Sequence, residues 1–360
     1  MDTLTHALSG ALLARALTAS GRSPRALPER WFGPPLTVGQ AVTVGAVAAA
    51  FPDIDFVLAW VSDLAYLRGH RGITHSLLLW PLWSVLLGVV LAGLFRRPQS
   101  WKRASWIAAS GVGIHIAGDW ITQFGTMLLA PVSDARFGLG STFIIDLVLT
   151  GVLVLGLLGS LLIRSSRVPA VVALALLPAW IGVSLLGRAE ALEFARAYAA
   201  REGIAAQTID AAPRPASPFN WTVVVFDGRQ YRYAHVNTRR AEPLVAGPDD
   251  DVIRRYSAPY QPLDRAQWHV AIKLPAGPDE ALVHAAWSHP EFEFFRWFAQ
   301  FPAVERIDRA ADGHCVWFKD LRFLTPGRST MPFRYGMCRL AGEAWRPFRL
   351  DGDEGRVVVQ

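Results

Sequence analysis

The chain has 360 residues, of which 52% are hydrophobic and only 18% are charged. An ordinary soluble domain carries about 25% charged residues. The charges are also unevenly distributed, with 21 in residues 1–187 and 45 in residues 188–360. This split excludes a single soluble globular domain, a disordered chain and a coiled coil. We therefore predict a helical membrane domain over 1–187 and a soluble domain over 188–360.

The net charge of +6 does not indicate a nucleic-acid-binding protein. Most of the excess lies in the short loops between apolar segments, where arginines are an ordinary sign of membrane orientation. No basic patch is interleaved with aromatic residues, as nucleic-acid sites require. We expect the lipid bilayer, and no nucleic acid, as a partner of this chain.

Apolar segments follow one another through the first part of the chain. A bilayer core of about 30 Å requires about 20 apolar residues per helix. The shorter first segment, 4–19, lacks the basic start of a signal peptide, and either spans the bilayer or lies against the other helices. Longer segments follow at 36–61, 73–95, 105–130, 142–163 and 168–187. The predicted fold is a membrane all-α bundle of five or six apolar helices, followed by a small soluble α+β domain.

Basic residues in the loops predict the orientation of this bundle. The loops after the first, third and fifth segments hold nine basic residues, and the alternate loops hold only Arg68, Arg71 and Arg136. Basic loops stay in the cytoplasm. With six spans, both termini face outward, so we expect an integral inner-membrane protein with its C-terminal domain on the extracytoplasmic side.

The C-terminal part has the pattern of a small α+β domain. An amphipathic helix over 189–202 precedes a hairpin whose Asp227-Gly228 turn supplies the required positive φ. Cys315 and Cys338 can form one disulfide if this part faces an oxidising compartment. The histidines here have no metal-ligand spacing, so core or surface roles are expected. The other predicted elements are strands at 269–274, 316–323 and 333–340 and a helix at 290–301.

The few ionisable groups of the membrane part carry the chemical signal. A carboxylate at mid-bilayer depth costs about 2.5–3.5 kcal/mol, so an unpaired one requires a function. His115 and Asp119 are spaced i,i+4, which places both on one helix face. The predicted topology brings them to the same membrane face as the FPDIDF and HRGITHS motifs and the first segment. The candidate metal ligands are His6, Asp53, Asp55, His70, His75, His115 and Asp119.

Imidazoles and carboxylates without cysteine suit Zn²⁺, and also Mn²⁺ or Fe²⁺. A zinc ion with three protein ligands leaves a position for a water whose pKa falls to about 7. Seven candidates exceed the needs of one ion, so one or two ions are expected, and two can hold the attacking and leaving oxygens of a phosphoryl displacement. Arg71 is placed to neutralise an anion. The predicted catalytic residues are Asp55, Arg71 and His75.

Other interpretations of the same residues stay open at this stage. The polar cluster is also compatible with a network that joins helices, or with an ion or proton path. A third class is a membrane-anchored interaction module in which the C-terminal domain binds a partner. His6 fits a buried structural histidine as well as a ligand, and Asp146 fits a helix cap. Asp63 and Asp134 are expected to be solvated loop charges.

Four stretches resemble one known family: MDTLTHALSG, FPDID, GHRGITHSLL and HIAGDWITQFGT. They are similar to the YdjM-type family of membrane-bound, metal-dependent hydrolases over about residues 1–165. More distantly, the His-x-x-x-Asp helix resembles the zinc-dependent phospholipase C superfamily, whose members cleave phosphodiesters. The resemblance implies that the seven candidate ligands form a metal site. It also implies a hydrolase in which a metal-activated water attacks a phosphoester or related ester, with a lipid among the candidate substrates.

Overall fold

The computed structural model describes residues 1–18, 28–310, 313–328, 331–340, 342–352 and 355–359, which form two units. The first unit comprises Met1–Leu58 and Gly69–Leu185, and the second comprises Ala59–Arg68 and Leu186–Gln360. The division of the chain into domains 1–187 and 188–360 stays a prediction.

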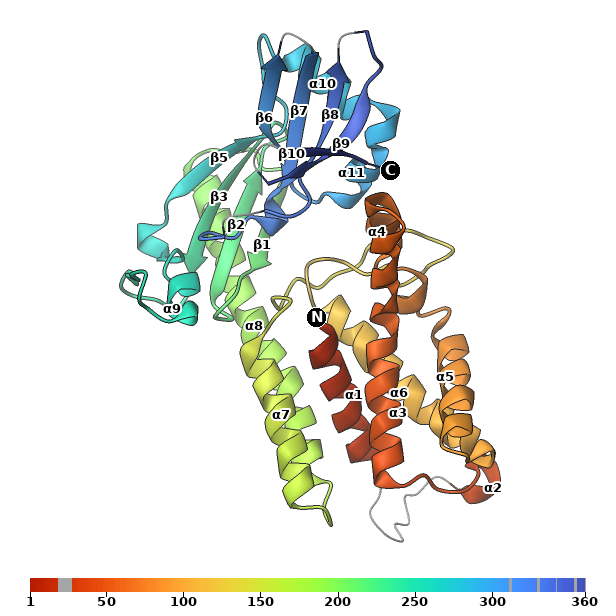
Figure 1. The fold of residues 1–360 in the computed structure, drawn as a ribbon. Helices are drawn as coiled ribbons and strands as arrows, with labels where there is room; N and C mark the ends of the chain where they lie inside the picture. Colours follow the sequence, from red (N-terminus) through yellow and green to blue (C-terminus); the bar gives the residue numbers. More distant parts are fainter. Residues whose placement is uncertain (19–27, 311–312, 329–330, 341, 353–354, 360) are drawn as a thin grey trace. The chain divides into compact units, whose positions relative to one another are not determined.

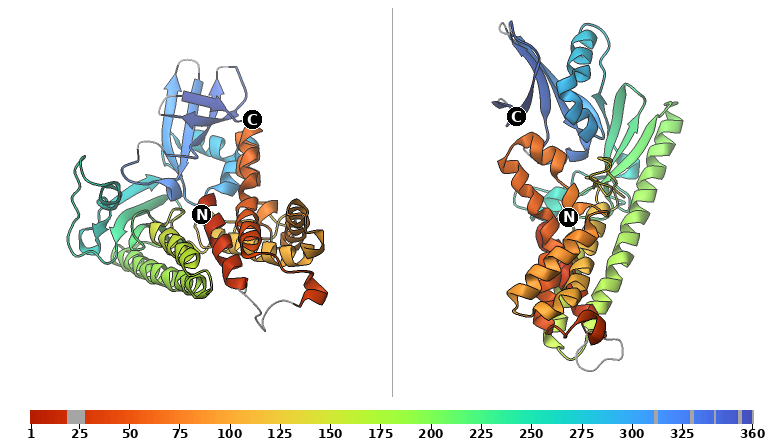
Figure 2. Two further views of the ribbon diagram at one scale, coloured as in Figure 1. Left: turned by 60° about the horizontal axis from the view of Figure 1, so that its bottom comes forward. Right: turned by 90° about the vertical axis from the view of Figure 1, so that its right-hand side faces the viewer.

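The first unit is helical, and its long helices run side by side (Figures 1 and 2). Hydrophobic residues of α1, α3, α5 and α6 form one core, and residues of α1, α7 and α8 form a second. The elements are α1 (Thr3–Leu17), α2 (Glu29–Phe32), α3 (Val38–Ala50), η1 (Phe51–Trp60), η2 (Ile73–His75), α5 (Trp80–Leu94), η3 (Pro98–Ser100), α6 (Trp101–Trp120), α7 (Leu147–Leu162) and the first half of α8 (Val168–Arg201).

Three glycines allow α1, α3 and α6 to meet at backbone contact. A Cβ atom on Gly10 would lie 2.2 Å from the carbonyl oxygen of Gly45, and one on Gly45 would lie 2.3 Å from that of Gly10. A Cβ on Gly111 would lie 2.8 Å from the Gly45 oxygen. Small residues let helices approach closely in membranes, where packing replaces the hydrophobic effect as the driving force. One turn from these glycines, α1 carries His6 and α6 carries His115.

Fewer helices can span a membrane than the five or six that we predicted. Among the described residues, two are long and apolar enough, Val38–Trp60 and Val168–Arg201. The pair Asp63–His75 and Trp80–Leu94, bent by 77°, raises the number to three if it counts as one span. The 15 residues of α1 and 16 of α7 rise only about 24 Å, short of the bilayer core.

The predicted apolar segment 105–130 is not one helix, because α6 ends at Trp120. The chain that follows, 121–146, contains no helix and folds back over the loop before α5. The Met127 N–H donates to the carbonyl of Arg71, at 2.9 Å, and the Leu77 N–H donates to the carbonyl of Leu128, also at 2.9 Å. Backbone hydrogen bonds therefore hold the HRGITHS segment in a fixed conformation.

After Ala59–Arg68, the second unit continues with the rest of α8, which packs on a five-stranded sheet. Ala191, Ala195 and Ala199 face Trp221 and neighbouring valines. The predicted hairpin is confirmed, because Phe226 pairs with Tyr231 around Asp227-Gly228. The strands are β1 (Thr208–Pro213), β2 (Asn220–Phe226), β3 (Gln230–Asn237), β4 (Gln261–Pro262) and β5 (Trp268–Ile272), in the order β1-β2-β3-β4, with β5 also on β3.

A second, antiparallel sheet has the order β10-β9-β8-β7-β6. Two helices cover one of its faces (Figure 2), where Trp287 contacts Phe318 and Phe294 contacts Tyr335. Cys315 and Cys338 pair across neighbouring strands and form a disulfide. The elements are α4 (Asp63–Gly69), α9 (Val252–Ser257), α10 (Glu280–Ser288), α11 (Glu293–Phe298), β6 (Pro302–Ala310), β7 (Gly313–Asp320), β8 (Tyr335–Leu340), β9 (Arg346–Asp351) and β10 (Gly355–Val358).

Two polar residues of this unit have structural roles. Asp63 is not the solvated loop charge that we expected, because it begins α4 and forms an ion pair with Arg349. His235 is largely buried, with Nδ1 2.8 Å from the Thr222 hydroxyl. Burial, assisted by Arg214 and His269, lowers the pKa of His235 to about 3. It therefore stays neutral at physiological pH, as a core residue does.

The glycine contact makes a testable prediction. Replacing Gly45 by alanine places a methyl group against the Gly10 carbonyl, and overpacking of this kind costs about 1–3 kcal/mol. We expect the Gly45→Ala variant to melt roughly 5 °C below the wild type, by thermal denaturation in detergent. Gly39→Ala on the same helix is the control, because nothing lies within 4 Å of its added Cβ. Equal melting temperatures for the two variants would refute the role of the contact.

Candidate metal centre

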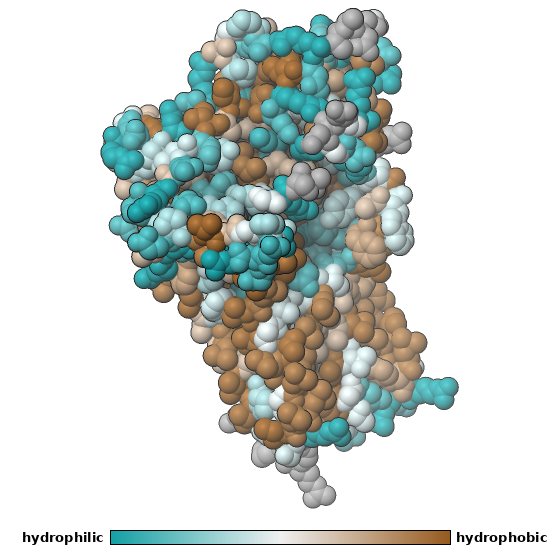
Figure 3. Space-filling model, turned by 60° about the vertical axis from the view of Figure 1, so that its left-hand side comes forward, coloured by the Kyte–Doolittle hydropathy of each residue, from teal (hydrophilic) through white to brown (hydrophobic). Residues whose placement is uncertain are grey.

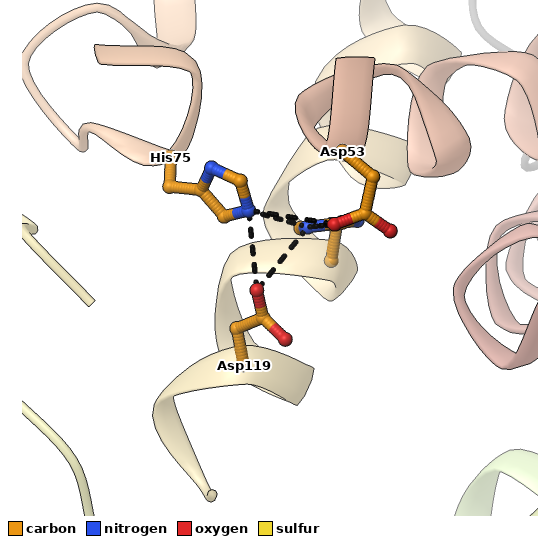
Figure 4. Close-up of side chains that lie close together, drawn as sticks. Asp53, His75 and Asp119 are labelled. Carbon is orange, nitrogen blue, oxygen red and sulfur yellow. Dashed lines mark hydrogen bonds and ion pairs between the residues drawn. The ribbon is translucent and has the colours of Figure 1, made fainter. Parts of the chain in front are cut away.

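Four side chains from three segments converge inside the first unit. Asp53 comes from η1, His75 from η2, and His115 and Asp119 from α6. Each offers one ligand atom, and these four atoms lie within 4.8 Å of one another. Figure 4 shows Asp53, His75 and Asp119 pointing toward a common point. We call Asp53, His75, His115 and Asp119 the four-donor group.

The distances within the four-donor group are those of atoms that surround one ion. His75 Nε2 lies 2.9 Å from His115 Nε2 and 3.1 Å from Asp119 Oδ2. Asp119 Oδ2 is 3.5 Å from His115 Nε2. Asp53 Oδ1 lies further out, at 3.8 and 3.7 Å from the two Nε2 atoms. A tetrahedral ion with bonds of about 2.0 Å has ligand–ligand distances of about 3.3 Å, so the group has the right size.

Hydrogen bonds on the far side of each imidazole fix which nitrogen carries the proton. His115 Nδ1 lies 2.6 Å from the carbonyl oxygen of Ala49, which only accepts. The Thr74 hydroxyl donates to Asp55 Oδ2 and lies 3.0 Å from His75 Nδ1, from which it then accepts. Assigned from these partners, both histidines carry the proton on Nδ1. Both Nε2 lone pairs therefore point into the four-donor group.

Four acceptors facing one another in a buried space repel unless a cation lies between them. His75, His115 and Asp119 have no solvent exposure, so water does not screen them. Asp119 Oδ2 has no hydrogen-bond partner among the described residues, and a buried carboxylate oxygen is costly when it is left unpaired. Two imidazole nitrogens and two carboxylate oxygens form a donor set suited to Zn²⁺, Mn²⁺ or Fe²⁺.

Asp55 supports this arrangement from behind His75. Its Oδ1 lies 2.8 Å from His70 Nδ1, and its Oδ2 accepts from the backbone N–H of Arg71 at 2.8 Å. Oδ2 is also 3.4 Å from His75 Nδ1. Carboxylates that contact the outer nitrogen of a metal-binding histidine fix its orientation and raise its basicity. Asp55 thus occupies the place of such an orienting carboxylate.

Arg71 is buried beside the four-donor group in a strained conformation. Its φ is +59°, in the left-handed region that residues other than glycine seldom adopt. The N–H contact with Asp55 and an ion pair of 2.9 Å between Nη2 and Asp119 Oδ1 hold it there. Nη1 donates to the Thr122 hydroxyl at 2.8 Å, whereas Nε has no hydrogen-bond partner among the described residues. One N–H of this buried guanidinium is therefore left unpaired by the described residues.

His6 contacts two members of the four-donor group from outside, Asp119 and His115. Its Nε2 is 3.1 Å from Asp119 Oδ1, and its ring stacks on that of His115 with centroids 3.7 Å apart. The amino group of Met1 also contacts Asp119 Oδ1. Asp119 thus uses one oxygen to anchor α1 and keeps the other for the four-donor group.

The structure brings the sequence candidates together in two layers. Four of the seven form the four-donor group, and His6, Asp55 and His70 surround it. Among the described residues, this is the one group of at least three potential ligands that can hold an ion. Binding by the outer three stays a prediction, as do the catalytic roles of Asp55, Arg71 and His75.

Several partners of the site were not predicted as functional residues. Thr74 precedes His75 within the HRGITHS motif, so its position was a usable signal. The carbonyl of Ala49 gave no such signal, because any residue provides a backbone acceptor.

The expected capping role of Asp146 is confirmed, since its side chain accepts from the N–H groups of Val148 and Leu149.

Fold and site together define a membrane protein with a buried, potentially metal-binding Asp/His cluster. The family described as YdjM inner membrane protein matches residues 1–191, and the chain belongs to this family. The Bacillus subtilis (strain 168) protein named "Uncharacterized protein YfhP" is 30% identical over 145 residues. That match covers 39% of this chain and 40% of the relative. No solved structure matches the chain significantly.

Metal analysis tests the four-donor group directly. We expect the purified protein to contain about one divalent ion per chain by elemental mass spectrometry. His75→Ala and Asp119→Ala should lose it, because each removes one of four donors. Asp55→Asn should retain it with an affinity about 10–100-fold lower, because only the orientation of His75 is weakened.

The matched control for these variants is His284→Ala, which removes an exposed histidine of α10. It should contain as much metal as the wild type. A metal-free wild type, or equal metal in all of these variants, would show that the cluster is a polar network between helices.

Proposed function

We propose that this protein is a membrane-bound, metal-dependent hydrolase that cleaves a phosphoester or a related ester. The observation that carries the proposal is the convergence of four acceptors on one buried point. A network that only joins helices would pair each acceptor with a donor, whereas here, with both protons assigned to Nδ1, the two Nε2 atoms lie 2.9 Å apart without a proton between them. We propose one ion at this point, most simply Zn²⁺, because the donors are two nitrogens and two oxygens.

A bound divalent ion would supply Lewis-acid activation of water and of an ester oxygen. Within the four-donor group, Asp53 is the most accessible member, with a side-chain exposure of 13%. It also has the longest distances to the two histidines. Water and substrate would therefore approach from the side of Asp53, while the other three donors hold the ion from within the helices.

The surrounding residues have distinct tasks in this proposal. Asp55 and Thr74 keep the proton of His75 on Nδ1, so that Nε2 stays a donor to the ion. Arg71 provides positive charge and one uncommitted N–H beside Asp119, which suits a substrate that carries or develops negative charge. Water is excluded from the inner side, because His6 and His115 stack there without exposure.

Hydrolysis of bis(p-nitrophenyl) phosphate and of phosphatidic acid by the detergent-solubilised protein tests this function. We expect chelation or Asp119→Ala to reduce the rate to background. Arg71→Ala should lower kcat/KM about 10²–10³-fold, the usual effect of removing one donor that stabilises transition-state charge. Its metal content should stay near that of the wild type.

A protein that holds its ion but hydrolyses neither phosphoesters nor carboxylic esters would contradict the proposal. Gly39→Ala serves as the control variant, because its added methyl contacts nothing within 4 Å. Its hydrolytic rate should equal that of the wild type.

We also propose that the second unit lies on the extracytoplasmic side of the inner membrane. Its two cysteines form a disulfide between β7 and β8, and such bonds persist in oxidising compartments. The orientation predicted from the basic loops assumed six spans, so the disulfide is the observation that carries this proposal.

Alkylation of the protein in cells lysed directly into denaturant, which makes the buried cysteines accessible, tests this orientation. We expect Cys315 and Cys338 to resist a maleimide–polyethylene glycol reagent applied at lysis, and both to react after reduction. The Cys315→Ser variant should expose one reactive thiol without reduction. Two free thiols in the untreated wild type would place the unit in the cytoplasm.

A further inference from the structure

An apolar crevice lies beside the four-donor group within the first unit. Its volume is about 240 Å³, and residues of α1, α6, α7 and α8 line it. Apart from His6 and Ser9, the lining side chains are apolar, among them Ile114, Leu174 and Leu177. An apolar cavity of about 150 Å³ suffices for a benzene-sized molecule, so this crevice has room for part of a hydrocarbon chain.

The crevice reaches the surface of the first unit, because its lining residues Ala117 and Pro178 are exposed. α8 is one of the candidate membrane spans, and only 22% of its most apolar window is buried. Val171, one helical turn before the lining residue Leu174, is 47% exposed. Figure 3 shows a largely hydrophobic face over these helices. In a bilayer, the molecules that reach such a crevice are lipid chains.

Gly118 and Pro178 shape the two walls of the crevice. A Cβ on Gly118 would lie 3.1 Å from His6 Cε1, so glycine allows the imidazole to lie close against α6. Pro178 stands inside α8 and lacks the N–H that would bond to the carbonyl of Leu174, another lining residue. Gly118 therefore sets the position of His6 at one wall, and Pro178 leaves one backbone carbonyl of α8 without its helical donor at the other.

The first two turns of α1 separate the crevice from the four-donor group. His6 lines the crevice and also lies 3.1 Å from Asp119 Oδ1. On the same helix, the Thr3 hydroxyl donates to Asp53 Oδ2 at 2.6 Å. A chain that fills the crevice therefore contacts His6, whose side chain in turn contacts Asp119 of the candidate metal centre.

We propose that this crevice binds the acyl chain of a membrane lipid, and that the substrates of the metal centre are lipid esters. The inference rests on the proposed function, because it assigns a substrate class to the same site. The chain would lie along α1, α6 and α8, and the head ester would lie at the first turn of α1. No polar group of the crevice requires a hydrophilic substrate, since the Ser9 hydroxyl donates to the carbonyl of His6.

Photolabelling of the full-length protein tests the binding step without relying on catalysis. The protein is placed in phosphatidylglycerol nanodiscs in which one acyl chain carries a diazirine. We expect labels on α6 and α8 residues that line the crevice, and a decrease of about tenfold in Ala117→Phe and in Leu177→Trp, which fill it from opposite walls. Leu155→Phe is the control, because Leu155 is 69% exposed on α7 and lies outside the crevice.

Kinetics with two substrates then link the crevice to the metal centre. Ala117→Phe should raise KM for a long-chain lipid ester about tenfold and leave the hydrolysis of a soluble p-nitrophenyl ester unchanged, with the metal content of the wild type. If Ala117→Phe and Leu155→Phe reduced photolabelling to the same extent, the inference would be overturned. This holds even if the protein contains metal and hydrolyses the soluble ester. Crevice labelling in a protein without metal would instead overturn the proposed function and the substrate assignment with it.

Discussion

The geometry of the candidate metal centre depends on the backbone contact of α1, α3 and α6 at Gly10, Gly45 and Gly111. Any side chain at these positions would push the helices apart, because the added Cβ atoms would lie 2.2–2.8 Å from a carbonyl oxygen of a neighbouring helix. One turn beyond the contact, His6 stacks on His115, and the carbonyl of Ala49 binds His115 Nδ1. The close approach therefore sets the position and tautomer of one metal-binding candidate.

Loops between the helices contribute the remaining residues of the candidate metal centre. The HRGITHS segment contributes His75, and the chain after α6 holds that segment through backbone bonds from Met127 and Leu77. Within it, Arg71 accepts a left-handed conformation because both its N–H and its guanidinium are bound to carboxylates. Strain of this kind persists where surrounding contacts outweigh it, and it tends to occur at functional sites.

The four-donor group contains hydrogen-bond acceptors without matching donors between them. Arg71 donates to Asp119 Oδ1 and Thr3 donates to Asp53 Oδ2, which are the outer oxygens of the group, so the inner atoms remain without protons. That arrangement is unfavourable in a low-dielectric interior unless a cation is present. Metal affinity and the folding of this unit should therefore be coupled, as in other proteins whose ligands are assembled from distant segments.

The C-terminal sheets show where sequence patterns were sufficient and where they were not. The Asp227-Gly228 hairpin was predictable, because alternation and turn chemistry act over a few residues. β9 and β10 were not predicted, since these short sequences become strands only by pairing, β9 with β8 and β10 with β9. Apolar composition also predicted more membrane-spanning helices than the described residues contain. Apolar composition continued past Trp120, where the backbone leaves the helix to cover the HRGITHS loop.

The sequence by itself determined the residue types of the site and the family. Buried imidazoles and carboxylates are costly in apolar helices, so their occurrence in FPDIDF, HRGITHS and the His115–Asp119 helix indicates a site from composition and spacing alone. Only the tertiary structure decided which four of the seven candidates share a point, because that depends on helix crossings and on hydrogen bonds to backbone carbonyls. Helix length was likewise decided in three dimensions, since packing against neighbouring segments, and not composition alone, sets where an apolar helix ends.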